Sequence, residues 1–438
     1  MLYTLIEEKA SIALSKRLIK NSLHTGLALV FIGLVPFAFN FLIARTFGRE
    51  TLGTINISLS FCLIITIFVT NYFGTAGTKF LAEYRGRKNL EHFILVFKIT
   101  FLGPLIILTI IGLVLISNWE FFSRTFSLPL ELATSLLAYI FIRSFYIIIR
   151  RVFYGIDLVK SYALNEIISA IVMLISLVLV CYANKPDLLI ECYLLSYTLF
   201  CLLGLKTLLG KFKSITNGMI SNKEFSTRKI VRSFSNYGAI SMIGTVASTS
   251  TGYISIIVTG IYLTHSDAGL YSSVLAIVSV LMFVPKLFTQ VFFPEFSKLF
   301  GEGDKQKILQ IFNQTTKVML AVSTFVCLIV FVFSEEIISI FGKDFSNGSL
   351  ILRIILPSLF VRMISIPFVS FLSGTKYVIY PNIGGLIILT ISTISWFILV
   401  PKYQLIGIAI GYTIGIIIGI GYQIIMAILK IKKFTLNY

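Results

Sequence analysis

Residues 140–155, IFIRSFYIIIRRVFYG, place a permanently charged arginine, Arg143, among isoleucine, phenylalanine and tyrosine in a stretch apolar enough to lie in lipid. The whole chain has this character: 57% of its 438 residues are hydrophobic, 13% are charged, and the mean hydropathy is +0.93. A soluble domain carries about 25% charged residues. Because backbone groups cannot stay unpaired in lipid, this composition predicts an all-α polytopic membrane protein.

Apolar runs close to 20 residues long, the length that crosses a hydrocarbon layer of about 30 Å, recur along the sequence. The first 20 residues are too polar for a signal-peptide core and are expected to form an amphipathic cytoplasmic lead-in. The apolar runs that follow predict about twelve transmembrane helices, at residues 22–44, 53–75, 95–117, 130–151, 162–182, 189–209, 237–262, 269–293, 314–334, 350–372, 381–400 and 404–429.

Lysine and arginine concentrate on one side of this arrangement. About 27 of the 37 basic residues lie in the two termini and in the loops after every second span, so the positive-inside rule predicts that both termini are cytoplasmic. This orientation accounts for the net charge of +18 without a nucleic-acid partner. The expected organisation is a cytoplasmic N-terminus, a six-helix bundle, a basic linker, a second six-helix bundle and a cytoplasmic tail, at residues 1–20, 21–210, 211–236, 237–430 and 431–438.

The two halves resemble each other at an offset of about 216 to 219 residues. RTFGRETLGTINISLSF (45–61) separates the first two spans as LTHSDAGLYSSVLAIVS (263–279) separates the seventh and eighth, which aligns Gly53 with Gly269. An even number of spans in each half makes the repeats parallel. We therefore expect two parallel six-helix bundles that form a V around a central cavity.

The same alignment pairs Gly155 with Gly374, and Arg143 and Arg362 each lie twelve residues before these glycines. An arginine at mid-membrane costs at least about 2.5 kcal/mol, so it should face a wet interior or a partner. We favour anion binding in the cavity. Pairing with an acid such as Glu166 and snorkelling to the interface are the alternatives.

Other residues are candidates for the same cavity. Lys286 is a third basic residue at depth, Asn40 is a polar candidate, and Pro36 and Pro285 are candidate hinges. None of the 19 acidic residues lies clearly in the middle of a span, although Glu166, near the start of one, could pair with a cation or couple transport to one. A cavity with basic and no acidic residues should hold anions and repel organic cations.

The sequence shows no arrangement typical of an enzyme. It contains no Ser-His-Asp set, no glycine-rich phosphate loop and no paired carboxylates within reach of one another. The five cysteines fit small core positions, and the three histidines fall in separate segments, so no metal site is predicted. We expect no cofactor and no catalysis.

The segment FLIARTFGRETLGTINISLSF (41–61) resembles the connection between the first two helices of polysaccharide-biosynthesis flippases, which carry lipid-linked oligosaccharides such as O-antigen units. These proteins belong to the multidrug/oligosaccharidyl-lipid/polysaccharide exporter superfamily. The positions typical of the family are Arg45, Gly48, Gly53 and Asn56. The polar start KRLIKNSLHTG, the number of spans and the basic linker extend this resemblance over the chain.

The resemblance implies a flippase of the bacterial inner membrane that moves undecaprenyl-pyrophosphate-linked repeat units of O-antigen, capsule or exopolysaccharide to the outer leaflet by alternating access. In the family, cationic cavity residues engage the pyrophosphate and acidic sugars, a role that Arg143, Lys286 and Arg362 suit here, with Arg45 as a further candidate. Implied partners are membrane lipids, a glycan polymerase, glycosyltransferases, and H+ or Na+ as coupling ion.

Two other functions compete with this interpretation. A cation-coupled multidrug and toxin extrusion antiporter would carry acidic residues within the membrane, and these are scarce here. A membrane scaffold or enzyme of glycan assembly would present a large external loop or a polar catalytic cluster, and the predicted outer loops are short.

Overall fold

The computed structural model describes residues 2–220, 227–283, 296, 299, 305–375 and 377–436. These residues are almost entirely helical, and the β-type pairing found among them is one isolated bridge between Asn89 and Ile220. The predicted all-α class is therefore confirmed.

The first half of the chain forms six long or medium helices and two short ones. They are α1 (Leu2–Gly86), α2 (Leu90–Ser117), α3 (Trp119–Phe126), α4 (Ala133–Gly155), α5 (Val159–Tyr182), η1 (Pro186–Leu188) and α6 (Leu189–Thr216), where α1 counts as two helices because it contains a break. The second half follows with α7 (Thr227–Tyr262), α8 (His265–Leu281), α10 (Lys305–Val332), α11 (Ser334–Ser339), η2 (Lys343–Phe345), α12 (Gly348–Ile364), α13 (Ile366–Gly374) and α14 (Ile379–Leu436).

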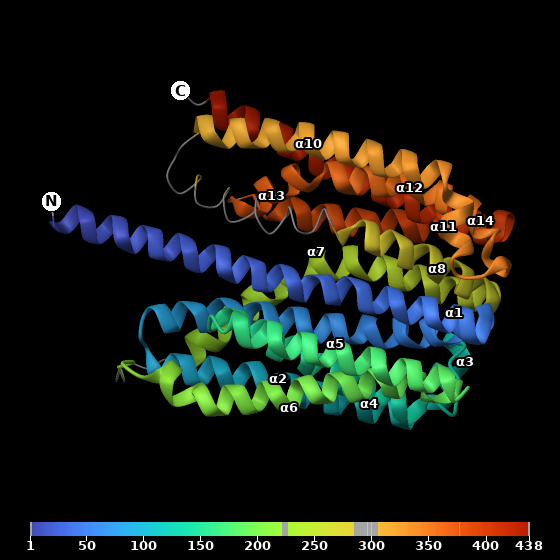
Figure 1. Cartoon of the computed structure of the whole chain (residues 1–438), viewed down its shortest axis with the longest axis horizontal. Helices are drawn as coiled ribbons and strands as arrows, with labels where there is room; N and C mark the ends of the chain where they lie inside the picture. The colour runs from blue at the N-terminus through green and yellow to red at the C-terminus, as the bar shows by residue number, and fades with distance from the viewer. Residues whose placement is uncertain are drawn as a thin grey trace.

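The helices α1 and α14 are each long enough to cross a membrane twice. Their stretches Gly33–Gly86 and Ile379–Lys432 are each 54 residues long, about 81 Å at 1.5 Å per residue, which is more than twice the hydrocarbon thickness. Each contains one residue with a non-helical backbone, Gly48 at φ 82° and Gln404 at φ 49°. Figure 1 shows the chain reversing direction within both helices.

Seven of the described helices are long and apolar enough to span a membrane, and the pair α12 and α13, bent by 44°, makes an eighth span. The shorter apolar helix α8 has 17 residues, and α4 carries three arginines along its length. Counting α1 and α14 twice, and adding α4 and α8, gives twelve candidate crossings, the number that the sequence predicts.

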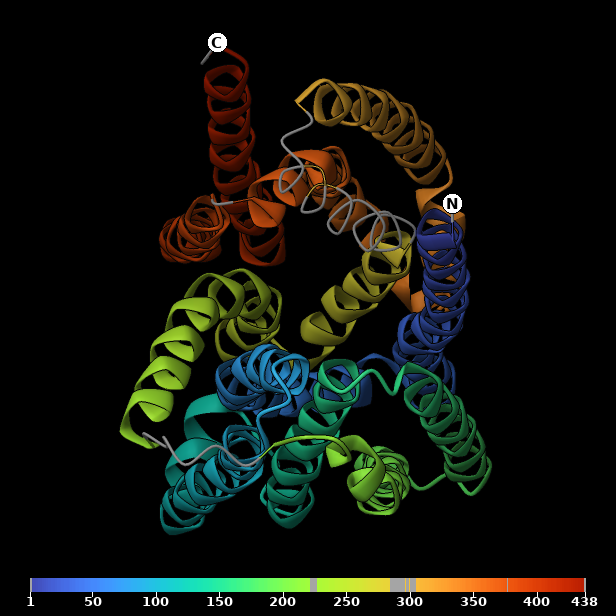
Figure 2. The same ribbon diagram turned by 90° about the vertical axis from the view of Figure 1, so that its left-hand side faces the viewer.

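The helices run side by side in two groups, and the two termini lie at the same end of the molecule (Figure 1). Figure 2, a view from that end, shows α1–α6 in one group and α10–α14 in the other, with α7 and α8 near the boundary. The helix α1 contacts α4 and α5 of its own group and also α7 and α8. The structure thus has the expected two-lobed architecture.

At the end away from the termini, the two halves touch through their backbones. A Cβ atom on Gly53 would lie 1.7 Å from the carbonyl oxygen of His265, and one on Gly269 would lie 1.9 Å from that of Arg49. The two glycines that the repeat alignment pairs are therefore in contact across the boundary. Only glycine allows so close an approach.

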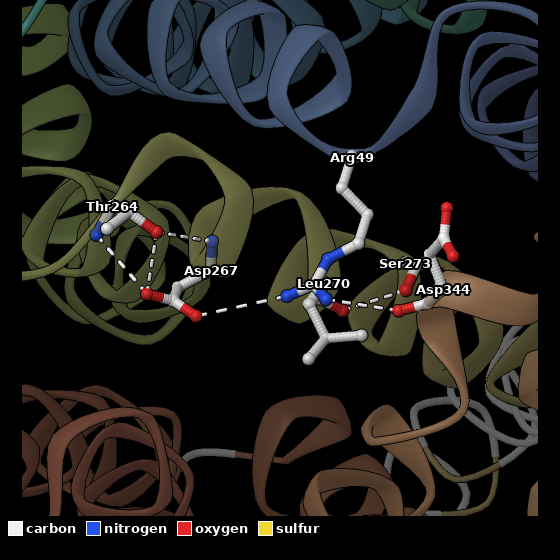
Figure 3. Close-up of polar contacts among 6 residues, drawn as sticks. All are labelled: Arg49, Thr264, Asp267, Leu270, Ser273 and Asp344. Carbon is white, nitrogen blue, oxygen red and sulfur yellow. Dashed lines mark hydrogen bonds and ion pairs between the residues drawn. The ribbon is translucent and has the colours of Figure 1, made fainter.

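Arg49 adds polar contacts at this closed end (Figure 3). Its Nη2 lies 3.9 Å from Oδ1 of Asp267, and its Nη1 donates to the carbonyl oxygen of Asp344 at 3.0 Å. Asp267 is held in place because it forms a capping box with Thr264 at the start of α8. These contacts join α1 to two separate segments of the second half.

Candidate functional site

A cavity of about 360 Å³ lies between the two halves, next to the closed end. We call it the outer compartment. Its wall comes from both lobes, because α1, α4 and α6 contribute on one side and α8, α12 and α14 contribute on the other, with α7 between them. The arrangement matches a site at the interface of two repeats.

A second, larger cavity of about 830 Å³, the inner compartment, continues from the first toward the end with both termini. Its wall includes Asn71 and Thr75 from the C-terminal part of α1, and Tyr237 and Ser241 from the N-terminal part of α7. Five residues line both compartments, which therefore form one path, the central cavity; they are Thr249, Gly252, Met282, Arg362 and Tyr412.

Arg143 and Arg362 both line the outer compartment. The guanidinium of Arg143 lies over the rings of Tyr146 and Tyr197, with Cζ 4.9 and 4.6 Å from their centroids, and that of Arg362 lies 5.8 Å from the centroid of Tyr412. The Nε atom of each arginine is buried without a hydrogen-bond partner. Ring contacts offset only part of the cost of a buried charge, so a bound anion would stabilise both side chains.

Neutral polar groups surround the two arginines. Asn56 donates from Nδ2 to Oδ1 of Asn40 at 2.7 Å, and Asn40 donates from its own Nδ2 to the carbonyl oxygen of Pro36 at 2.7 Å. Pro36 and Asn40 line the outer compartment, and the backbone around Pro36 is helical, so its role as a hinge stays a prediction. Five tyrosines complete this wall: Tyr139, Tyr193, Tyr197, Tyr253 and Tyr412.

Glu166 lies beside the cavity in a small side pocket of about 50 Å³ that Arg143 also lines. Its Oε1 accepts a hydrogen bond from the hydroxyl of Tyr146 at 2.6 Å, while its Oε2 is buried without a partner. No ion pair within 4.0 Å joins Glu166 to Arg143 in the described part of the chain, so the link between them passes through Tyr146. A coupling role for Glu166 stays a prediction.

The structure places Arg45 outside the central cavity, which corrects the expectation for this residue. Arg45 is exposed at the closed end, three residues before the break at Gly48, and its Nε donates to the carbonyl oxygen of Ile340 at 2.6 Å. It serves as a contact between the halves. The other two candidates, Lys286 and Pro285, lie outside the described residues.

Arg151, the last residue of the predicted span 130–151, lines the inner compartment. It lies eight residues after Arg143, about 80° from it around the helix, so helical spacing favours Arg150 and does not single out Arg151. Neither compartment has an aspartate or glutamate among its described lining residues. The described wall of the central cavity therefore carries three arginines and no acid.

The described residues include no group of three or more histidine, cysteine, aspartate or glutamate side chains that could hold a metal ion. The five cysteines are unpaired thiols in buried or half-buried positions.

Comparison with solved structures identifies the fold. The chain superimposes on an inward-facing multidrug resistance MATE family transporter of the MOP superfamily with a TM-score of 0.78 at 14% identity, covering 92% of this chain and 95% of that one. The TM-score with an outward-facing transporter of the same description is 0.70 at 15% identity, and the superposition covers 96% of both chains. A MOP superfamily transporter from Pyrococcus furiosus Vc1 (DSM3638), described as having a binding pocket of reverse polarity that suggests a different function, gives 0.69 at 14% identity, also with 96% of both chains covered.

Comparison of sequences identifies the family. The family described as MatE matches residues 241–400, and no protein with a curated description matches the chain. The family described as Polysaccharide biosynthesis protein matches residues 18–300, well over half of the chain. This result agrees with the resemblance inferred from the segment 41–61: the chain is a multi-pass membrane protein with the fold of the MOP superfamily transporters, and it belongs to the polysaccharide biosynthesis protein family.

Proposed function

We propose that this chain is a flippase that moves anionic, lipid-linked saccharides across the membrane by alternating access. The substrate class is a polyprenyl-pyrophosphate-linked oligosaccharide, such as the undecaprenyl-linked repeat units of O-antigen, capsule or exopolysaccharide. The observation that carries the proposal is the pair Arg143 and Arg362, which line one cavity between the halves with no described acid on its wall.

The chemistry of the cavity fits such a head group. A diphosphate with several sugars cannot cross about 30 Å of hydrocarbon unaided, whereas the prenyl tail is stable in lipid. Guanidinium groups form charge-assisted, often bidentate, hydrogen bonds with phosphate and carboxylate oxygens. The hydroxyls of the tyrosines and the amides of Asn40 and Asn56 supply donors and acceptors for sugar hydroxyls.

The shape of the cavity supports one step of an alternating cycle. The cavity widens toward the end with the termini and is closed at the other end by Gly53 and Gly269. With both termini in the cytoplasm of a bacterial inner membrane, this is a state loaded from the cytoplasmic leaflet. Rocking the two halves would then expose the head group outside, and a membrane potential that is negative inside favours outward movement of an anion.

A second candidate function is cation-coupled multidrug extrusion. Two observations favour it: the match of residues 241–400 to the MatE family, and the buried carboxylate of Glu166 in a side pocket of the cavity. This function requires an organic cation to bind beside Arg143 and Arg362, which Coulomb repulsion opposes. We propose that the chain is a transporter without enzymatic activity. We also propose that H+ or Na+ is the coupling ion and that the chain contacts enzymes of glycan assembly.

The test is export of lipid-linked intermediates in a strain that lacks the chain and is complemented with variants. Arg143→Ala and Arg362→Ala should each slow export by about 10- to 150-fold, since a hydrogen bond to a charged group contributes about 1.5 to 3 kcal/mol. Lysine at either position should retain part of the activity. Arg87→Ala is the matched control, because Arg87 is 68% exposed and pairs with Glu83 away from the cavity.

Two results would count against the flippase. If both alanine variants, present at wild-type abundance, export lipid-linked intermediates normally, then the two arginines have no role in transport. Sensitivity of the deletion strain to cationic drugs, with no accumulation of glycan intermediates on the cytoplasmic leaflet, would favour the extrusion antiporter.

A further inference from the structure

We propose that Arg151 forms a separate anion site in the inner compartment, where it holds the diphosphate of the substrate while the saccharide occupies the outer compartment. This inference rests on the proposed function and deepens it, because it assigns the two ends of the head group to two places. It also gives the substrate a direction in the cavity, with the phosphates toward the end that carries the termini.

Arg151 is held firmly on the cavity wall. It reaches from α4 to the second part of α1, where Nη1 donates to the carbonyl oxygen of Thr70 at 3.2 Å and to Oγ1 of Thr75, and Nη2 donates to Oδ1 of Asn71 at 2.7 Å. Gly74 leaves the room for this side chain, because a Cβ atom there would lie 2.6 Å from Cδ of Arg151. The guanidinium is therefore positioned before any ligand arrives.

All of these partners are neutral. No described acid lies within 4.0 Å of Arg151, and no described acid lines the inner compartment. Three bonds to described residues leave two of the five N–H donors of a guanidinium for a ligand. A half-buried charge that lacks a counter-ion is stabilised by an anion in the cavity.

The position of Arg151 separates it from Arg143, whereas Arg362 lines both compartments. Arg151 lies eight residues, about 12 Å along the helix axis, from Arg143, which lines the outer compartment and the side pocket but not the inner compartment. An elongated head group, with phosphates at one end and sugars at the other, fits two sites that follow each other along the helix in this way. In the other half, the repeat alignment pairs Ser370 with Arg151. Ser370 lines the same compartment, and its hydroxyl is buried without a hydrogen-bond partner among the described residues.

A purely structural role is the alternative, in which Arg151 only ties α4 to α1. The structure offers a variant that separates the two roles. Asn71→Asp keeps an oxygen acceptor at the position that Nη2 contacts and replaces a neutral partner by a carboxylate. The tie between the helices is preserved or strengthened, while the positive charge available to a ligand is neutralised.

The experiment measures binding of sugar-free polyprenyl diphosphate to the purified full-length chain in nanodiscs. Arg151→Gln and Asn71→Asp should each weaken binding about 10- to 150-fold, and Arg151→Lys should weaken it less. Arg143→Gln should weaken binding of this sugar-free probe less than Arg151→Gln does, since Arg143 lines the other compartment. Arg87→Gln serves as the control for loss of an exposed arginine.

The outcomes are distinct. Failure of the wild-type chain to bind polyprenyl diphosphate would overturn the proposed substrate class and the Arg151 site together. Wild-type binding that Asn71→Asp leaves unchanged would show that Arg151 is a tie between helices and would leave the proposed function standing. Equal losses from Arg143→Gln and Arg151→Gln would overturn the assignment of the diphosphate to the inner compartment. If Arg151→Gln does not fold, unchanged binding in Asn71→Asp still overturns the Arg151 site.

Discussion

Replacing Gly53 or Gly269 by alanine should open the end of the cavity that these two glycines close. In the structure, a new Cβ atom on Gly53 would lie 1.7 Å from the carbonyl oxygen of His265, and one on Gly269 would lie 1.9 Å from that of Arg49. Both obstacles are backbone atoms, so no side-chain rotation removes the clash. The helices α1 and α8 must move apart at this point.

The size of the effect follows from the geometry. Cβ atoms essentially never approach other heavy atoms closer than 3.0 Å, so the His265 carbonyl must retreat by about 1.3 Å from its 1.7 Å position. Overpacking of this kind costs about 1 to 3 kcal/mol. If the contact is absent when the outer end is open, the equilibrium shifts toward that state by about 5- to 140-fold.

A cysteine reporter in the cavity measures this shift. Thr249 is exposed and lines both compartments, so Thr249→Cys is a suitable site. Labelling by a membrane-impermeant maleimide, added outside intact cells, should proceed at least about five times faster in Gly53→Ala or Gly269→Ala than in the parent. The background needs replacement of the five native cysteines, which are Cys62, Cys181, Cys192, Cys201 and Cys327.

Gly210→Ala is the matched control, because a Cβ atom at Gly210 meets nothing within 4 Å. It should leave the labelling rate unchanged. The reasoning is refuted if Gly53→Ala and Gly269→Ala label from outside at the same rate as Gly210→Ala while the chain is present at equal abundance.

Two further substitutions test neighbouring contacts. Arg49→Ala removes the ion pair with Asp267 and the hydrogen bond to the Asp344 carbonyl. The pair is partly exposed and contributes about 0.2 to 1 kcal/mol, so the rate of labelling from outside should increase less than in Gly53→Ala. An equal or larger increase would contradict this ranking. Tyr146→Phe leaves the buried carboxylate of Glu166 without the donor to its Oε1 and should destabilise the first half by about 1 to 3 kcal/mol. Thermal unfolding in detergent measures the loss for Tyr146→Phe, with Tyr182→Phe, at a side chain that is 91% exposed, as a control that should melt like wild type.

The sequence by itself determined the fold class, the number of crossings and the pairing of the two halves. These follow from coarse quantities: apolar length sets how often the chain crosses lipid, and an even number of crossings sets the parallel repeat. The equivalence of Gly53 with Gly269 and of Arg143 with Arg362 also follows from counting residues. In the structure, the first pair meets at the boundary and the second lines one cavity.

Only the tertiary structure decided which basic side chains face the cavity. Arg150 and Arg151 are neighbours in the sequence, yet the first reaches the hydroxyl of Tyr146 and the second reaches Asn71 on another helix and lines the inner compartment. The side chain of Arg45 donates a hydrogen bond to a backbone carbonyl of the opposite half. The physical reason is that one residue along a helix turns a side chain by about 100°, so the rotation of each helix against its neighbours, which local sequence does not specify, selects the partner.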